Sequence, residues 1–307
     1  MATVLGMNHH GKGRVRLLKV VRRGSVHSVV QFTVEILLDG PMETAFTKGD
    51  NSIIIPTDTQ KNTVYVVAKN HAFECAEDFA LILTRHFLKT YPQLVSRCRV
   101  CVQEVIWDRI ISQDSAGKTR PHDHAFVKRG PYTLTARSEG VRNAAGFPVI
   151  SLWGGVKELV LFKTTQSSFV DFHKDENTSL PEASDRLLGT CMDGEWVYDS
   201  GGVTSFKDLR ALILDTLMKT FSGPADTGVP SPSLQLTCFQ MGSAVLAAAP
   251  SVKSINLLMP NVHNLPFDLS KYGLINKDHT GLPDIFYPTD EPHGIIQATV
   301  ERPVSRL

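Results

Sequence analysis

Three polar segments of this chain contain residue types that could bind a small anion and move its protons. The first, Gly49–Thr63, places Thr57 and Asp58 just before an apolar-periodic run that predicts a helix. A helix N-terminus presents free backbone amides, which attract an anionic ligand. A structural role fits the same geometry, because a Thr or Asp at the N-cap accepts hydrogen bonds from those amides.

The second segment carries Phe169 and Phe172 and is followed by Arg186. Aromatic rings offer a face on which a planar ligand can stack, and a guanidinium is a rigid donor fork for paired acceptors. The structural alternative is a strand end followed by a polar loop, with both phenylalanines in the core. The sequence leaves both interpretations open.

The third segment, Leu258–Asn264, contains Asn261 and His263. These residues are two positions apart, so they share one face if the chain is extended there. Histidine titrates near neutral pH and can shuttle a proton. A single histidine can equally be a structural residue.

Strands and helices must position these segments, and their patterns alternate along the chain. The first half predicts strands around Val15–Val20, Val29–Leu38, Val95–Trp107 and Asp123–Arg137, with helices over Thr59–Lys69 and Cys75–Lys89. The second half predicts strands over Val156–Lys163, Leu187–Tyr198, Ile255–Met259 and Gly294–Glu301, with helices over Ser205–Phe221 and Ser233–Ala249. Each half thus has the order strand, strand, helix, helix, strand, strand.

That repeated order predicts an α+β fold of two half-domains, residues 1–150 and 151–307, with antiparallel sheets and helices on one face. Such a sheet has a second face and open edges that need protection. We therefore expect the chain to form an oligomer.

Composition excludes several classes of protein. The 307 residues include 32 Lys+Arg against 31 Asp+Glu, a formal net charge of +1. A nucleic-acid or membrane-surface protein would show a basic excess. No apolar run reaches the ~18 residues that span a bilayer, and the first residues lack the apolar core of a signal peptide. We expect a soluble intracellular protein.

Five scattered cysteines, an odd number, predict reduced thiols. Cys98 and Cys101 form a CxxC pattern, but the surrounding residues predict a strand. Residues three apart on a strand point to opposite faces, so this pair is unsuited to binding one metal ion.

Taken together, the motifs resemble the urate oxidase (uricase) family. The matching segments, in family order, are Gly11-Lys12, DNSx(4)TDTxKNT at Asp50–Thr63, HxHAF at His122–Phe126, KTTxSxF…L…DR at Lys163–Arg186, SPSxQ at Ser231–Gln235, PNxH at Pro260–His263 and GLINK at Gly273–Lys277. They cover nearly the whole chain. One departure is Asn177, where the family usually has an aromatic residue.

The resemblance implies a cofactor-free oxidase with the tunnelling fold (T-fold), in which two ββααββ half-domains per subunit assemble as a barrel-forming homotetramer with active sites at subunit interfaces. It further implies substrate-binding roles for Thr57, Asp58, Phe169, Arg186, Leu234, Gln235 and Asn261, and for Leu180 in the pocket lining. Lys12, Thr57 and His263 would form a catalytic proton relay, and Asn261 with Thr57 would hold dioxygen or water. Thr57 and Asp58 would come from a neighbouring subunit.

The implied chemistry suits these residue types. Urate is a planar anion, a guanidinium can grip its acceptors, and a carboxamide can read an edge with both donors and acceptors. Loss of a second proton makes urate electron-rich enough to react with dioxygen. A buried lysine amine can take that proton through a threonine hydroxyl. The expected products are 5-hydroxyisourate and hydrogen peroxide.

Two other functions stay open at this point. A metal-dependent pterin enzyme of the same fold would use His122 and His124, which share a face of a strand, together with a third ligand. A non-catalytic scaffold would bind purines without turning them over, although the intact set of expected catalytic residues argues against this.

The last three residues, Ser305-Arg306-Leu307, resemble a peroxisomal targeting tripeptide. An oxidase that releases hydrogen peroxide fits that organelle. We therefore expect a peroxisomal protein, or a cytoplasmic one if the source is bacterial.

Overall fold

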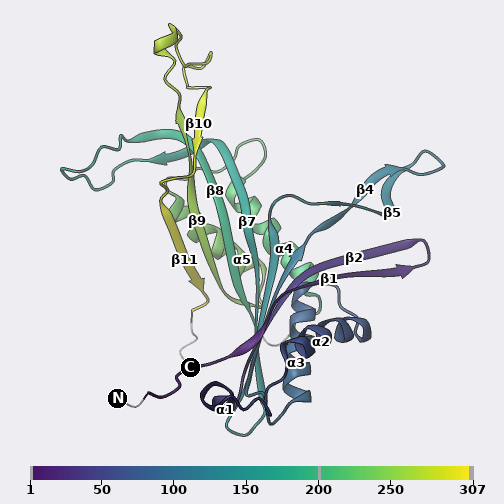
Figure 1. Ribbon diagram of the computed structural model, residues 1–307. Coiled ribbons are helices and arrows are strands. Elements are labelled where there is room, and N and C mark those ends of the chain that lie inside the picture. The colour runs from purple at the N-terminus through teal and green to yellow at the C-terminus, as the bar shows by residue number, and fades with distance from the viewer. Residues whose placement is uncertain (1–2, 200–201, 304–307) are drawn as a thin grey trace. The chain divides into compact units, whose positions relative to one another are not determined.

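The computed structural model describes residues 3–199 and 202–303 and contains antiparallel strands and helices (Figure 1). The strands are β1 His10–Arg23, β2 Val26–Asp39, β3 Arg97–Val105, β4 Trp107–Gln113, β5 Thr119–Lys128, β6 Thr133–Arg142, β7 Pro148–Phe169, β8 Ala183–Tyr198, β9 Val252–Pro266, β10 Phe286–Thr289 and β11 Ile295–Glu301. The helices are α1 Glu43–Lys48, α2 Thr57–Asn70, α3 Ala76–Thr90, α4 Phe206–Ser222 and α5 Leu234–Ala248, with a 3-10 turn at Ser270–Tyr272.

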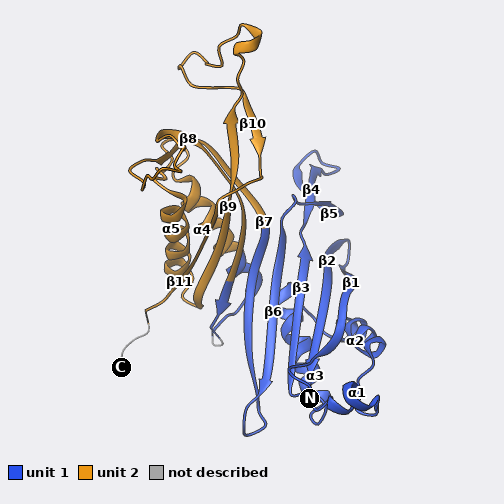
Figure 2. Cartoon of the chain, turned by 60° about the vertical axis from the view of Figure 1, so that its left-hand side comes forward, with its two compact units in different colours: residues 1–157, 196–210 blue, residues 158–195, 211–307 orange. Residues whose placement is uncertain are grey.

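The chain forms two compact units (Figure 2). Unit 1 comprises residues 1–157 and 196–210, and unit 2 comprises residues 158–195 and 211–307. Strands β7 and β8 each contribute residues to both units, so neither unit is one continuous stretch of chain. The division into half-domains at residue 150 stays a prediction.

In unit 1 the strands β1, β2, β3, β6 and the first part of β7 follow one another as antiparallel neighbours. Their side chains alternate between faces, and on β3 the buried positions are Cys98, Val100 and Val102. Helix α2 packs on β1 and α3 packs on β3 and β6, so apolar residues of α3 such as Phe79 and Phe87 are fully buried. This layer forms the core of unit 1.

In unit 2 the order is β7, β8, β9, and β9 pairs with both β10 and β11 as antiparallel partners. Helices α4 and α5 lie side by side in this unit (Figure 2), and α5 packs on β9 and β11. Leu217 of α4, Met241 of α5 and Leu257 of β9 are fully buried. A helix layer on an antiparallel sheet therefore occurs in this unit too.

The predicted α+β fold class is confirmed, because both units combine antiparallel strands with packed helices. The strand expected at Asp123–Arg137 is wrong: β5 ends at Lys128 and β6 begins at Thr133. Gly130 adopts a left-handed φ of 32° and the next residue is a proline, which cannot donate to a strand ladder. Residues 114–118 form the turn of the β4–β5 hairpin.

None of the described helices is long and apolar enough to cross a membrane. Cys98 is buried and Cys101 is partly exposed on alternating positions of β3, as the CxxC argument predicted. Within residues 3–199 and 202–303 no two cysteines are joined by a disulfide.

Candidate active site

A cavity of about 690 Å³ in unit 2 collects most of the residues that the sequence singled out. Its lining includes Phe169, Leu180, Arg186, Leu234, Gln235, Asn261 and His263. These come from β7, the β7–β8 connection, β8, α5 and β9. The volume lies within the ~300–1,000 Å³ range of small-molecule sites. Residues as far apart in the sequence as Thr164 and Ile296 thus line one site.

Asp185, the residue before Arg186 near the start of β8, is hydrogen-bonded to β7. The Asp185 carboxylate accepts a hydrogen bond from Thr165 Oγ1 at 2.6 Å and one from the Ser167 amide at 3.4 Å. Both partners lie on β7, so Asp185 ties the two strands together beside the cavity. The guanidinium carbon of Arg186 lies 5.3 Å from the centroid of the Phe169 ring, a cation–π distance.

The Arg186 guanidinium is only partly solvated. Its Nε is buried and has no hydrogen-bond partner among the described residues. Burial lowers the pKa of Arg186 from its usual value, because desolvation disfavours the charged form. A buried donor left unpaired is costly, so this side chain is prepared for an acceptor that the protein itself does not supply.

Phe169 has a supporting neighbour on one side. Its ring lies 4.8 Å from that of Phe172, centroid to centroid, with an interplanar angle of 12°. This offset-stacked arrangement holds Phe169 at the cavity wall. Phe169 lines the cavity and Phe172 stacks against it, whereas the alternative that both phenylalanines lie in the core is wrong because both are partly exposed.

The N-terminus of α5 forms a second wall. Ser233 is the N-cap, and its side chain accepts a hydrogen bond from the Leu236 amide at 3.1 Å. Leu234 and Gln235 are the first two helical residues, so their amides have no intrahelical acceptor. Leu234 is buried and Gln235 is exposed. This end of the helix favours an anion.

Asn261 and His263 come from the C-terminal part of β9. The Asn261 amide donates to the Gly294 carbonyl at 3.0 Å, and His263 lies opposite Thr289 in the pairing with β10. The segment is extended and both side chains line the cavity. Val262 and Asn264 line the cavity as well, so the expectation that Asn261 and His263 share a face stays a prediction.

The remaining predicted residues, Lys12, Thr57 and Asp58, lie in unit 1. The exposed Asp58 carboxylate pairs with the Lys61 ammonium and accepts from Asn62 Nδ2 at 2.9 Å. The Lys61 hydrogen bond and charge lower the pKa of Asp58, and the charge of Lys12 contributes to the same effect. Lys12 lies in β1 two residues after His10, whose Nε2 is 2.7 Å from the Ile55 carbonyl just before α2.

The N-cap interpretation of Thr57 and Asp58 is wrong. The N-cap position is Pro56, no side chain caps the helix, and Thr57 is the first helical residue. Thr57 is half-buried and its first-turn amide is free of intrahelical bonds. The Thr57 hydroxyl is thus not used for local capping.

A contact between β1 and the start of α2 brings Lys12 to this place. The Gln60 carboxamide nitrogen donates to the Ile55 carbonyl at 3.1 Å and lies 3.0 Å from Nε2 of His10, which is 2.7 Å from the same carbonyl. At Gly11 a Cβ would lie 1.9 Å from the Ile36 carbonyl oxygen, so only glycine fits. A bulge begins at Lys12.

The sequence matches the Uricase family over residues 8–138 and 153–297. It is 36% identical over 296 residues to a protein named Uricase from Oryctolagus cuniculus, covering 96% of this chain and 94% of that protein. It is 39% identical over 316 residues to a Uricase from Arabidopsis thaliana, covering 97% and 96%. The chain belongs to the uricase family. It is therefore an oxidoreductase.

Solved structures agree with this membership. A crystal structure of uricase from Arthrobacter globiformis superposes with a TM-score of 0.86 at 34% identity, covering 100% of this chain and 98% of that one. A urate oxidase from Bacillus sp. TB-90 has a TM-score of 0.79 at 21% identity, covering 96% and 100%, which shows a common fold. The predicted T-fold is confirmed by these neighbours.

Asn177, the departure from the family pattern, lies away from the cavity lining. It is exposed in a turn, where its amide donates to Asp175 Oδ1 at 2.9 Å. Asn177 is not among the residues that line the cavity.

The histidines of the metal-dependent alternative lie on β5 in unit 1. The His122 and His124 rings are perpendicular, 4.6 Å apart by centroid. Nδ1 of His122 already accepts the amides of His124 and Ala125, at 3.2 and 3.0 Å. Across the part of the chain that the structure describes, no group of three His, Cys, Asp or Glu side chains is arranged to hold a metal ion.

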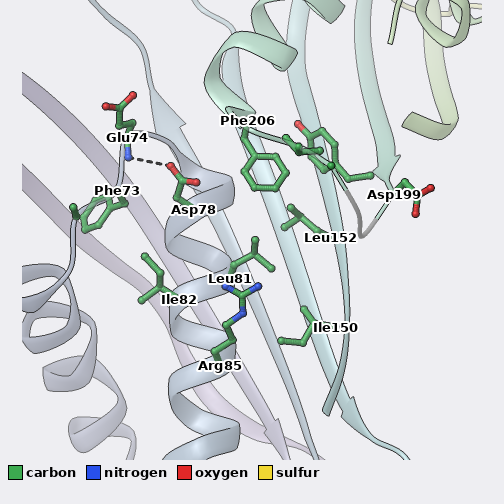
Figure 3. Close-up of a pocket in the computed structure, with 14 residues that line it drawn as sticks. Phe73, Glu74, Asp78, Leu81, Ile82, Arg85, Ile150, Leu152, Asp199 and Phe206 are labelled. Atoms are coloured by element: carbon green, nitrogen blue, oxygen red, sulfur yellow. Dashed lines mark hydrogen bonds between the residues drawn. The ribbon is translucent and has the colours of Figure 1, made fainter. Parts of the chain in front are cut away.

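A second pocket, of about 500 Å³, lies in unit 1 and differs from the cavity of unit 2 (Figure 3). The carboxylates of Glu74 and Asp78 and the guanidinium of Arg85 lie around apolar side chains such as Leu81. The Glu74 amide donates to Asp78 Oδ2 at 3.1 Å. Its lining contains none of the residues that the sequence predicted for a site.

Sequence reasoning missed two kinds of residue around the unit 2 cavity. Asp185 and Lys163 were noticed only as parts of motifs, while their hydrogen bonds to other segments were not foreseen. Apolar wall residues Leu265, Leu282 and Phe286 come from the β9–β10 region. Their surroundings are polar and irregular in sequence, so no periodic pattern identifies them.

Proposed function

We propose that this protein is a urate oxidase that converts urate, dioxygen and water into 5-hydroxyisourate and hydrogen peroxide without a metal or organic cofactor. The observation that carries the proposal is the unpaired, buried Nε of Arg186 beside Phe169 in a cavity that also holds the N-terminus of α5. A planar anion with several acceptors satisfies all three features at once. Family membership gives the same substrate.

Arg186 and the α5 terminus bind the substrate in this proposal. The guanidinium takes two acceptors of the urate ring system, and the Leu234 amide donates to a third. The Gln235 carboxamide has both a donor and an acceptor and reads a mixed edge. Phe169 stacks on the ring. Leu180 closes the pocket beside it.

The reaction moves two electrons from urate to dioxygen. Lys12 accepts a proton from bound urate through the Thr57 hydroxyl, and His263 orients the amine or passes the proton on. Asn261, with Thr57, holds dioxygen and then water above the ring. Dioxygen takes both electrons and two protons and leaves as hydrogen peroxide, while a water oxygen bonds to the oxidised ring. Atoms balance, since one water and one dioxygen are consumed.

The relay and the cavity come together in a homotetramer in this proposal. Lys12, Thr57 and Asp58 belong to unit 1, and the lining of the unit 2 cavity includes none of them. A neighbouring subunit would therefore supply Thr57 and Asp58 to the site. The outer strand β1 supports association, because its Leu18 side chain is 61% exposed on a sheet edge.

The proposed location is the peroxisome. It rests on Ser305-Arg306-Leu307, which lie outside the described residues. A fluorescent protein fused to the N-terminus of the full chain should enter peroxisomes of a eukaryotic cell. The same fusion without these three residues should stay in the cytosol.

One assay tests the proposed reaction. Purified protein, dialysed against a chelator, is mixed with urate in air, and the ultraviolet absorbance of urate and the release of peroxide are followed. Loss of absorbance with one peroxide per urate supports the oxidase. No loss contradicts it, and activity that chelation removes and zinc restores would favour the metal-dependent alternative.

A further inference from the structure

Two side chains near the end of β7 bind the segment that leads into α5. The Lys163 ammonium donates to the Val229 carbonyl and to Ser231 Oγ, both at 2.8 Å. The Gln166 carboxamide nitrogen donates to the Thr227 carbonyl at 2.7 Å. Segment 227–231 is therefore held by three side-chain hydrogen bonds from one strand.

Backbone bonds add to this attachment. The Ser231 amide donates to the Gln166 carbonyl at 2.7 Å, and the Ser168 amide donates to the Ser231 carbonyl at 3.0 Å. Segment 227–231 and the end of β7 run parallel at the bridge between Ser167 and Ser231. Segment 227–231 thus behaves like a short added strand beside the end of β7.

The backbone at Gln166 makes the paired attachment possible. Residues 163 and 166 would point to opposite faces of a regular strand. Gln166 has a left-handed φ of 62°, which interrupts the alternation and lets both side chains reach segment 227–231. Gly228 is needed opposite, since a Cβ there would lie 2.6 Å from Gln166 Oε1.

The polar groups at the centre of this contact are buried. Ser231 and Thr237 are each 2% exposed, and Thr237 Oγ1 donates to Ser231 Oγ at 2.8 Å. Burial lowers the pKa of Lys163, whose ammonium also lies 5.4 Å from the Phe221 ring centroid. Burying the Lys163 charge costs desolvation free energy, which an apolar side chain at this position would avoid. We therefore expect Lys163 to have a role beyond filling this space.

The place of segment 227–231 in the chain supplies that reason. Ser231 is followed after one proline by Ser233, the N-cap of α5, and then by Leu234 and Gln235. The last two residues line the same cavity as Arg186. Any shift of Ser231 is transmitted to them over three or four residues of chain.

We propose that Lys163 and Gln166 form a latch that positions the Leu234 and Gln235 donors for urate binding. This rests on the proposed urate oxidase function. Both are positioning residues that act through segment 227–231 and touch neither substrate nor dioxygen. The latch sets the affinity of the cavity, whereas the proton relay of Lys12, Thr57 and His263 is separate from it.

The main test compares Lys163→Met with wild type in steady-state urate oxidation. We expect KM to rise about tenfold, which corresponds to the loss of about one hydrogen bond from the N-terminus of α5 to the urate anion. We expect kcat to change less than about threefold. Lys157→Met is the matched control, because Lys157 is exposed on the same strand. A fall in kcat at unchanged KM would overturn the proposal, as would an equal effect of the control.

Two further variants separate positioning from general stability. Lys163→Arg keeps the charge and the donors, so its KM should return to within about threefold of wild type. Ser231→Ala removes one of the two acceptors that Lys163 binds, and the double variant should be less impaired than the product of the two single effects. Fully multiplicative effects would overturn the latch. If Lys163→Met does not fold, Ser231→Ala and Gln166→Ala carry the KM test.

Amide hydrogen exchange tests the latch without urate. Peptides covering residues 227–236 should exchange faster in Lys163→Met than in wild type, while peptides of β9 should not change. The wild-type protein could fail to oxidise urate while residues 227–236 still exchange faster in Lys163→Met. That result would contradict the proposed function and support the attachment of segment 227–231 by the latch. Unchanged exchange in 227–236 would overturn the latch whatever the activity.

Discussion

Two arginines withdrawn from solvent, one in each unit, differ in what surrounds them. In unit 1, Arg210 donates to both oxygens of Glu104 at 2.6 and 2.8 Å and to Glu77 at 3.2 Å. In unit 2, Arg186 stands over Phe169 with its buried Nε unpaired. The protein supplies two carboxylate partners to the first guanidinium and leaves the buried Nε of the second without a partner among the described residues.

The pKa values of the two groups follow the same contrast. Burial alone would lower the pKa of Arg210, but the hydrogen bonds and charges of Glu104 and Glu77 outweigh it and raise that pKa. For Arg186 burial acts alone and the pKa is lowered. A buried charge with carboxylate partners is part of the scaffold, and one without them indicates a ligand.

The unit 1 cluster also has a structural task. Glu104 accepts the Ala76 amide at 2.9 Å, and Tyr198 donates its hydroxyl to Glu77 at 3.0 Å. Ala76 and Glu77 are the first residues of α3, where the helix dipole favours negative charge. The cluster therefore joins β3, β8, α3 and α4 within unit 1.

The largest expected effect is on turnover, and it separates the chemical step from the binding of urate by the unpaired Arg186. Lys12→Met removes the amine that accepts the substrate proton but leaves Arg186 in place. We expect kcat to fall about 10²–10⁴-fold, the usual contribution of general acid–base catalysis, with affinity for a non-reactive urate analogue within about threefold of wild type. Stopped-flow turnover and calorimetric binding measure the two. Normal turnover would show that the relay assignment is wrong.

Removing the paired arginine should damage folding and spare binding. In Arg210→Met the carboxylates of Glu77 and Glu104 stay buried without a cation, which should lower the free energy of unfolding by about 3–5 kcal/mol. Urea titration followed by circular dichroism measures this. At low temperature, where the variant is folded, KM for urate should be unchanged. A raised KM at full folding would abolish the contrast between the two arginines.

Removing the unpaired Arg186 should impair the reaction with urate and leave the stability of the fold nearly unchanged. Arg186→Gln loses two charged hydrogen bonds to urate, so kcat/KM should fall about 10²–10³-fold. The free energy of unfolding without ligand should stay within about 1 kcal/mol of wild type, because the buried Nε of Arg186 has no hydrogen-bond partner among the described residues. Strong destabilisation by this substitution would contradict the view that the group awaits a ligand.

The smallest effect concerns pH. Burial raises the pKa of Glu77 despite the opposing charge of Arg210, and Glu104, Tyr198 and Cys75 also face this cluster. The contribution of protonated Glu77 to stability is complete below its unfolded-state pKa of about 4.3. This contribution is lost as the pH rises through the pKa of Glu77 in the folded state. Glu77→Gln cannot ionise, so its stability relative to wild type should improve with rising pH, by about 1 kcal/mol. A difference independent of pH would contradict this.

Local patterns predicted the elements with strong periodicity. The spacing of Phe79, Leu83 and Phe87 predicted a helix over Cys75–Lys89, and α3 spans Ala76–Thr90. The β4–β5 hairpin was not predicted, because its residues are mostly polar or partly exposed and show weak alternation. Helix α1 has no buried residues and so gave no apolar signal.

The sequence alone determined which residue types are available and which of them share a face. Alternation along a strand predicts that Asn261 and His263 share a face of β9, and Leu234 and Gln235 begin α5 because Ser233 is a good N-cap. The tertiary structure decided which charges acquire partners. Lys163 meets Ser231 across 68 positions and Arg210 meets Glu104 across 106, and only packing of the layers brings such residues together. Arg186 and Arg210 have the same residue type. The fold pairs Arg210 with carboxylates, which makes it a structural group, and places Arg186 at the cavity, where it can bind a ligand.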